Sequence, residues 1–301
     1  MVGIIRGFFG FLRWLGPNRA SDWGGVIARA IGPLLPVHRI ALANIRAAYP
    51  EADERRVQEI ALGAWENLGR TGAEYAHLDT LFDYDHANPK PNGRIEIIGM
   101  EHLVALRDDG RPGILFSAHT GNWELSAIYA NKYNLEMTAV FRMPNAPAVA
   151  QAVHEIRSKT MGNMQAARRG AAFAMLSVLE KGTHLGMLID QHFTRGVTLP
   201  FFNRPALTNP TLGKFARRFD CPVVGARVIR LPGHRFRIEL TPPLDLPRDA
   251  EGLIDPMGAM AAMTAVVEGW VREYPEQWLW MHRRWRVPAS KMTANTSAAE
   301  Q

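Results

Sequence analysis

The chain has 301 residues, of which 47% are hydrophobic and 21% are charged. This length and balance allow one large buried core and exclude a disordered or fibrous protein. A single cysteine, Cys221, excludes an internal disulfide framework and a cysteine-built metal site. The net charge is +6 and only six of the 35 basic residues are lysines, although a high genomic G+C content would also enrich arginine. A basic, arginine-rich chain suits nucleic acid, an anionic membrane or an acidic protein as partner.

The amino-terminal segment, MVGIIRGFFGFLRWLG, is apolar but contains Arg6 and Arg13. A membrane-spanning helix needs roughly 20 mostly apolar residues, and a signal peptide places its charge before an uninterrupted apolar stretch. We therefore expect residues 1–20 to form a basic amphipathic helix in the membrane interface, with arginines toward anionic headgroups. The alternative is a helix packed on the protein's own core. The first interpretation predicts a peripheral or monotopic membrane protein that faces the cytoplasm.

Residues 21–85 are predicted to form a helical amino-terminal region, because apolar residues recur at spacings near three and four. Pro50 interrupts this pattern, and the acidic residues that follow provide a negative first turn for the next helix. A polar, proline-bearing stretch, HANPKPNG at 86–93, then separates this region from the rest of the chain. We interpret this stretch as a boundary between subregions and not between independent domains.

From residue 86 to 289 the pattern is that of an α/β protein, because short apolar runs alternate with helix-like segments. The predicted strands are Ile95–Ile98, Gly113–Ser117, Met137–Phe141, His184–Ile189, Pro222–Val228 and Phe236–Leu240. The predicted helices are Trp123–Lys132, Val149–Thr160, Ala171–Lys181, Thr211–Phe219 and Pro256–Tyr274. This order predicts a mixed, largely parallel sheet flanked by helices. The small, polar residues 290–301 are expected to form a disordered tail.

The segment GILFSAHTGNWE, residues 113–124, places a histidine and a glutamate between a predicted strand and a predicted helix. Ligands bind at such strand ends in open α/β sheets. If the turn brings Glu124 to one ring nitrogen of His119, the other nitrogen is left as a general base for an attacking hydroxyl. Backbone N–H groups near Gly121 are candidate oxyanion donors. Because a His and a Glu five residues apart also occur by chance, the hypothesis depends on this structural context.

The block HTGNWE resembles the H-x4-[DE] motif of the glycerolipid acyltransferase superfamily, and in this form the bacterial lipid A late acyltransferases, the lauroyl and myristoyl transferases. Further blocks follow in that family's order over about residues 35–288. They are Phe141-Arg142, Arg169-Gly170, Asp190-Gln191-His192, Pro200-Phe201-Phe202 and PEQWLWMHRRW at 275–285. The loop after Asp190 departs from the family at Asn203 and Asn209-Pro210, which leaves the acceptor less certain than the chemistry.

The resemblance implies transfer of an acyl chain from an acyl carrier protein thioester to a hydroxyl or hydroxyacyl group of a lipid A precursor. It implies His119 as base, Glu124 as the residue that orients it, and neither a cofactor nor a metal. The same chemistry on another glycolipid or a lysophospholipid stays open, as does coenzyme A as donor. A non-catalytic membrane protein on a decayed fold is disfavoured by the intact motif residues. Nucleic acid is not expected as a partner, because no recognised binding module is present.

Four further residues are candidate substrate contacts. Arg142 follows a strand and suits a phosphate or the acceptor, unless it forms a structural ion pair. Arg169 is similar, with a solvated pair of arginines as the alternative. Asp190 follows the strand at 184–189, where it either orders the site arginines or the His119–Glu124 pair, or caps a turn. Gln191 is the next residue along the chain.

Two aromatic groups have both a structural and a functional interpretation. Phe201 and Phe202 are expected in the core, with an acyl groove as the alternative. The tryptophan- and arginine-rich segment at 278–285 suits either membrane anchoring or packing over the core.

Overall fold

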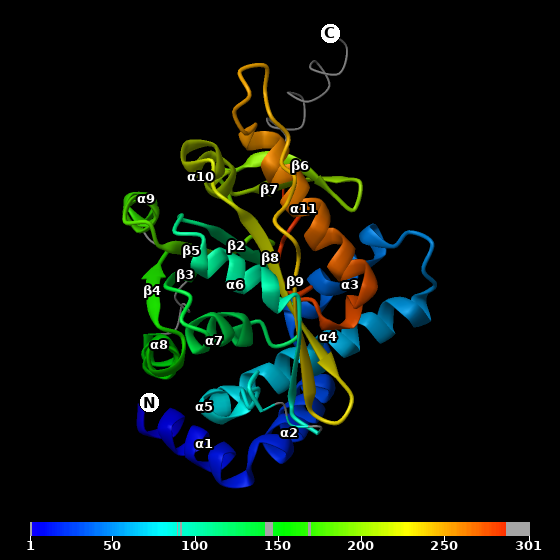
Figure 1. The fold of residues 1–301 in the computed structure, drawn as a ribbon. Coiled ribbons are helices and arrows are strands. Elements are labelled where there is room, and N and C mark those ends of the chain that lie inside the picture. The colour runs from blue at the N-terminus through cyan, green and yellow to red at the C-terminus, as the bar shows by residue number, and fades with distance from the viewer. Residues whose placement is uncertain (1, 89, 91, 142–146, 168–169, 287–301) are drawn as a thin grey trace.

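The computed structural model describes residues 2–88, 90, 92–141, 147–167 and 170–286. The expected tail at 290–301 and the candidates Arg142 and Arg169 lie outside these ranges. A seven-stranded sheet forms the centre of the molecule, in the order β1-β9-β8-β2-β5-β3-β4 (Figure 1). Its strands are β1 (Ile95–Ile98), β2 (Ile114–Ser117), β3 (Met137–Phe141), β4 (Asn163–Ala166), β5 (His184–Leu188), β8 (Val223–Leu231) and β9 (Arg235–Leu240).

Neighbouring strands of this sheet run parallel, except for the antiparallel pair β8–β9. The predicted mixed, largely parallel sheet is therefore confirmed. Two further strands, β6 (Val197–Phe201) and β7 (Arg204–Thr208), form a separate antiparallel hairpin. The sequence did not predict β4, which is short, or this hairpin. Pro200 and Pro205, which face each other in the hairpin, are residues that argue against a strand.

The helices precede and flank the sheet. The amino-terminal ones are α1 (Val2–Leu15), α2 (Pro17–Ile31), the 3-10 turn η1 (Gly32–Leu34), α3 (Pro36–Ala48), α4 (Glu54–Glu74), η2 (Tyr75–His77) and α5 (Leu78–Leu81). The others are α6 (Met100–Asp108), α7 (Glu124–Lys132), α8 (Pro147–Thr160), α9 (Ala171–Glu180), α10 (Thr211–Phe219), α11 (Pro256–Glu273) and η3 (Pro275–Gln277). The predicted helical region before residue 86 is confirmed, and α6 was not predicted.

The sheet separates two apolar cores, because successive side chains of a strand point to opposite faces. On β2, Ile114 and Phe116 join the core formed with α9, α10 and α11. Leu115 joins the other core, with α6 and α7. Full burial of β2 on both faces fixes its position in the sheet, and therefore the position of the turn that follows it.

Helix α1 packs on the protein through one face only. Leu12 is buried against Ala20, Ala73 and Ala76. Arg13 donates hydrogen bonds to the carboxylate of Asp79 at 2.7 and 2.9 Å. Arg13 therefore has an acidic partner within the protein while its side chain stays 55% exposed, and its contact with anionic headgroups stays a prediction. The side chain of Arg6 lies outside the described part of the chain.

Large apolar side chains remain exposed on the first three helices. They are Phe8, Phe11 and Trp14 on α1, Trp23, Val26, Ile27 and Ile31 on α2, Leu34 and Leu35 at η1, and Val37 on α3. None of the described helices is by itself long and apolar enough to cross a bilayer. Pro17–Leu34 and Pro36–Ala48 meet those criteria only as a pair, which is bent by 90°.

Candidate active site

His119 and Asp190 meet at the carboxyl ends of two neighbouring parallel strands. Ser117 of β2 lies in register with Leu188 of β5, and His119 and Asp190 each follow two residues later. Nδ1 of His119 lies 2.8 Å from Oδ1 of Asp190. The backbone N–H of His119 donates to the other oxygen, Oδ2, also at 2.8 Å. One carboxylate therefore fixes both the main chain and the ring of the histidine.

This pairing determines which nitrogen of His119 is free to act as a base. An ionised carboxylate can only accept a hydrogen bond, so in the neutral form of the ring Nδ1 carries the proton and Nε2 keeps its lone pair. Burial raises the pKa of Asp190, but the charge and hydrogen bonds of His119 outweigh it and hold that pKa well below its ordinary value. The side chain of Asp190 is fully buried, and that of His119 is 16% exposed. The amide nitrogen of Gln191 lies 3.3 Å from Nε2.

The carboxyl-terminal segment packs against His119 and Asp190. The indole N–H of Trp278 donates to Oδ2 of Asp190 at 2.7 Å, and the N–H of Leu279 donates to the carbonyl of His119 at 3.2 Å. Ring nitrogen Nε2 of His282 lies 3.3 Å from the carbonyl oxygen of Asp190. Trp278 is 1% exposed and Trp280 is fully buried. Packing over the core, and not membrane anchoring, is therefore the outcome for these two tryptophans.

Glu124 does not orient His119 in the way the sequence predicted. Its carboxylate accepts hydrogen bonds from Arg157 of α8 and from the hydroxyl of Tyr75. It also accepts one from the indole N–H of Trp123, at 2.8 Å. The ring of Trp123 contacts that of His119 edge to face, with centroids 5.1 Å apart. The structure corrects the predicted partner of His119 from Glu124 to Asp190, and the glutamate reaches the histidine only through the indole.

The ion pair of Glu124 and Arg157 lies in a largely apolar environment, where an unpaired charge is costly. Burial lowers the pKa of Arg157, but Glu124 and Tyr75 more than offset this effect and raise it above its ordinary value. Burial and the Glu124 carboxylate also raise the pKa of the Tyr75 hydroxyl well above its ordinary value. Arg157 therefore stays charged and the phenol of Tyr75 stays neutral over the physiological range.

Gly121 has a structural position and not the predicted role of an oxyanion donor. Its N–H donates to the carbonyl of Gln277 at 3.2 Å. Its φ of +55° favours glycine, and a Cβ at this position would lie 2.3 Å from the carbonyl oxygen of Val228. The carbonyl of Gly121 accepts from Asn67 at 2.9 Å and from Thr71 at 3.1 Å. Because its backbone groups are already bonded within the protein, the oxyanion prediction is wrong for this residue.

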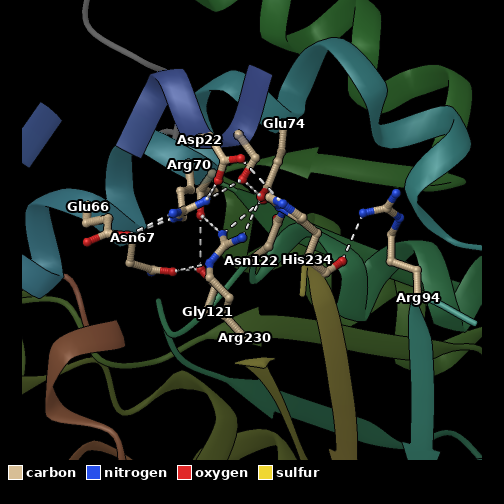
Figure 2. A network of polar contacts seen from close by, with 12 residues as sticks. Asp22, Glu66, Asn67, Arg70, Glu74, Arg94, Gly121, Asn122, Arg230 and His234 are labelled. Atoms are coloured by element: carbon tan, nitrogen blue, oxygen red, sulfur yellow. Dashed lines mark hydrogen bonds and ion pairs between the residues drawn. The ribbon is translucent and has the colours of Figure 1, made fainter. Parts of the chain in front are cut away.

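A buried polar network connects the turn after His119 to the amino-terminal helices (Figure 2). Glu74, at the end of α4, forms an ion pair with Arg230 of β8. Its second oxygen accepts from the amide of Asn122 at 2.8 Å, and its first accepts from Ser21 of α2 at 2.6 Å. Burial raises the pKa of Glu74, but Arg230 outweighs it and the pKa is lowered. The network joins α2, α4 and β8 to the turn after His119.

An apolar cavity of about 80 Å³ lies beside this turn, between the sheet and helices α7 and α8. Met137, Ala139, Gly186 and Met187 of β3 and β5 are among the residues that line it. Ala127 of α7 and Met161 line it as well, and Trp123, Glu124 and Arg157 contribute its polar part. Most of the residues that line it are apolar.

Phe201 and Phe202, the alternative groove residues, are instead buried in the core. They do not line the cavity. Among the residues that the structure describes, no group of three or more His, Cys, Asp or Glu side chains is arranged to hold a metal ion.

Comparison with known proteins identifies the family. The sequence model of a family described as bacterial lipid A biosynthesis acyltransferase matches residues 3–287. The chain belongs to this family. It is 27% identical over 192 residues to a lipid A biosynthesis acyltransferase of Haemophilus influenzae, an alignment that covers 62% of this chain and 58% of the relative. It is 26% identical over 268 residues to a lipid A biosynthesis lauroyltransferase of Escherichia coli, covering 83% of this chain and 78% of the relative.

As a member of the lipid A acyltransferase family, the chain carries the H-x4-E motif on a strand-to-helix turn, where the sequence placed it. Sequence reasoning missed the partners of its glutamate, Arg157 and Tyr75. Asp190, which the sequence predicted either to order the site or to cap a turn, contacts the ring of His119 directly and so takes the place predicted for Glu124. One signal was available for the aspartate, because it follows the strand β5 by the same two residues that separate the histidine from β2.

Proposed function

We propose that this protein transfers a fatty acyl chain from an acyl carrier protein thioester to a hydroxyl or hydroxyacyl group of a lipid A precursor. The observation that carries the proposal is the contact between His119 and the buried Asp190, which leaves Nε2 unprotonated at a strand end. The family supports the acyl transfer and the lipid A precursor.

In the proposed reaction, Nε2 of His119 removes the proton of the acceptor hydroxyl as its oxygen attacks the thioester carbonyl. The C–O bond forms, the carbonyl becomes a tetrahedral oxyanion, and His119 becomes an imidazolium that the Asp190 carboxylate stabilises. Collapse of this intermediate breaks the C–S bond, and the thiolate takes the proton from Nε2. The products are an ester and a free thiol, so no cofactor is consumed.

The oxyanion needs a hydrogen-bond donor near the reacting nitrogen. The amide nitrogen of Gln191 is 3.3 Å from Nε2 of His119, so it is close to any carbonyl that the hydroxyl attacks. An acceptor hydroxyl at Nε2 would displace this amide and free its N–H groups for the oxyanion. We assign this role to Gln191 in place of Gly121.

The apolar cavity supports an acyl group as the transferred unit. Trp123 both contacts the ring of His119 and lines the cavity, so an acyl chain in the cavity would leave its carbonyl near the base. Glu124 accepts a hydrogen bond from the indole N–H of Trp123, and Arg157 holds the Glu124 carboxylate by donating to its other oxygen. We assign to Glu124 the role of a positioning residue for this tryptophan and for the entrance of the cavity.

The exposed apolar side chains on α1, α2 and α3 support peripheral binding to the inner membrane from the cytoplasmic side. Phe11 contacts both Trp14 and Trp23. Exposed apolar side chains that gather in this way mark an interaction site, and tryptophan and phenylalanine favour the bilayer interface. Residues 1–20 would lie on the membrane with α2 and not alone. Trp14→Ser with Leu34→Ser is expected to reduce sedimentation with anionic vesicles, and unchanged sedimentation would exclude this face.

The reaction is tested by incubating the protein with acyl carrier protein thioester and a tetra-acylated lipid A precursor, and measuring products by mass spectrometry. His119→Ala is the matched control, and a lysophospholipid is offered in parallel. A new ester on the lipid A precursor that the variant does not form supports the proposal. Transfer to the lysophospholipid alone keeps the mechanism and rejects the substrate, and full activity of His119→Ala rejects the base.

A further inference from the structure

A second, open cavity of about 360 Å³ lies between α3, the start of β7 and the carboxyl-terminal segment. Its lining includes the arginines Arg39, Arg204, Arg283 and Arg286, together with Trp285 and Asn44. We name these four arginines the arginine pocket. No acidic residue is among those that line the cavity, so four positive side chains surround this open space.

The charges of the arginine pocket have no acidic partner in the part of the chain that the structure describes. Within the described ranges, none of its four guanidinium groups forms an ion pair with a carboxylate. One nitrogen of Arg204, Nη1, is buried and has no hydrogen-bond partner. Arg230, whose side chain is 13% exposed, is by contrast paired with Glu74. The buried Arg284 also leaves its Nε without a partner, but its other two nitrogens donate to the carbonyl of Leu207 and the hydroxyl of Thr208. A buried guanidinium N–H without a partner costs free energy, so this arrangement indicates an anionic ligand.

Several residues that line the pocket are held in place by contacts with the rest of the protein. The guanidinium of Arg204 stacks on the ring of Trp285 at 4.8 Å, and the indole N–H of Trp285 donates to the carbonyl of Phe201 at 2.9 Å. Asn44 of α3 donates to the carbonyls of Trp280 and His282 at 3.0 and 2.7 Å. The helix and the terminal segment are therefore held together at the pocket.

Two neighbours of the pocket indicate where its ligand comes from. Arg39 follows the exposed apolar residues Leu34, Leu35 and Val37 at η1 and the start of α3. On the other side, the terminal segment that carries Arg283 also carries Trp278, which donates to Asp190. The pocket thus lies between the proposed membrane face and the candidate active site.

We propose that the arginine pocket binds the phosphate group of a membrane-lying lipid, in the first place the phosphate of the acceptor. The planar fork of arginine matches phosphate oxygens in pairs. A phosphate held here would place the headgroup at the bilayer surface, with the sugar hydroxyls toward His119. The identity of that lipid as the acceptor rests on the proposed function, whereas phosphate binding does not.

The first test measures binding of inorganic pyrophosphate by calorimetry, without any acyl transfer. The double variant Arg204→Gln/Arg283→Gln is compared with Arg55→Gln, which removes an exposed arginine on α4. We expect the double variant to lose about tenfold or more in affinity, since it removes charge-assisted hydrogen bonds, and the control to bind as the wild type does. Equal binding by all three proteins would overturn the site.

The second test identifies the lipid. If the pocket holds the acceptor phosphate, the double variant raises KM for a phosphorylated acceptor and leaves KM for its dephosphorylated form unchanged. If the pocket holds an ordinary phospholipid headgroup, the double variant binds phosphatidylglycerol vesicles more weakly and its KM for the acceptor does not change. That result also supports a lipid phosphate as the ligand of the pocket. A rise in KM for the carrier thioester alone would assign the pocket to the donor and overturn the proposal. Absence of transfer by the wild type would contradict the proposed function and leave the pyrophosphate result standing.

Discussion

Asp190 holds His119 at two points, since Oδ1 faces the ring nitrogen Nδ1 and Oδ2 accepts the backbone N–H, each at 2.8 Å. Oδ2 also accepts the indole N–H of Trp278. The carboxylate thus sets the backbone turn and the orientation of the ring together. An aspartate that only capped a turn would not also reach the ring.

Asp190→Asn should impair the reaction more than the fold. The amide keeps the size of the carboxylate but loses the charge that stabilises the imidazolium, and it can donate to Nδ1 and so select the wrong tautomer. We expect kcat to fall by about 100-fold or more, the usual scale of a general-base contribution. Steady-state kinetics measures this. Glu124→Gln is the comparison, and a larger kcat effect at that position would restore the glutamate as the principal partner of the base.

Ala127→Leu should shorten the preferred acyl chain. Ala127 lines the apolar cavity, and the larger side chain would occupy part of the space that the end of an acyl chain fills. Each methylene that no longer fits loses roughly 0.8 kcal/mol, about fourfold in affinity. Competition between thioesters of different length, analysed by mass spectrometry, measures the preference. Ala43→Leu, in the arginine pocket cavity, is the control that should keep the wild-type chain length, and an unchanged preference in Ala127→Leu would assign the chain elsewhere.

Glu74→Ala should destabilise the protein strongly, because it leaves Arg230, whose side chain is only 13% exposed, without its carboxylate partner. Removal of one member of a buried pair costs about 3–5 kcal/mol. The free energy of unfolding in urea is the measurement. Glu59→Ala, which breaks an exposed pair with Arg55 on the same helix, should leave the stability near that of the wild type. Similar effects of the two substitutions would mean that the network does not hold the turn.

His282 should make the protein less stable as the pH falls from about 6.5 to about 4. Burial lowers the pKa of His282 to about 4, against an ordinary value of 6.5. Between these values the unfolded chain binds a proton that the folded one does not, so stability rises with pH through this range. The change is on the order of 3 kcal/mol for a shift of this size.

Urea unfolding at several pH values, for the wild type and His282→Gln, tests this effect. The glutamine cannot titrate, so the stability of the variant should lose the pH dependence that His282 causes. The pH dependence caused by His38, whose pKa burial also lowers, should remain. A wild-type slope in the variant would contradict the assignment to His282.

The sequence alone was enough for six of the seven strands of the sheet, because strands buried on both faces read as short apolar runs such as 113–117 and 184–189. It was also enough for the location of the candidate active site, since a histidine after a buried strand must lie at the edge of the sheet. These features depend on local patterns of a few residues. Short or proline-bearing strands such as β4 and the β6–β7 hairpin have no such pattern, and they were missed.

The partners of the site residues were decided by the tertiary structure. Glu124 is five residues from His119 but bonds to Arg157, 33 residues away, whereas Asp190 reaches the histidine from 71 residues away. The contact exists because β2 and β5 are neighbours in register, and strand order is a property of the whole sheet. The arginine pocket has the same origin, since α3, β7 and the terminal segment are distant in the chain and meet only when the core is packed.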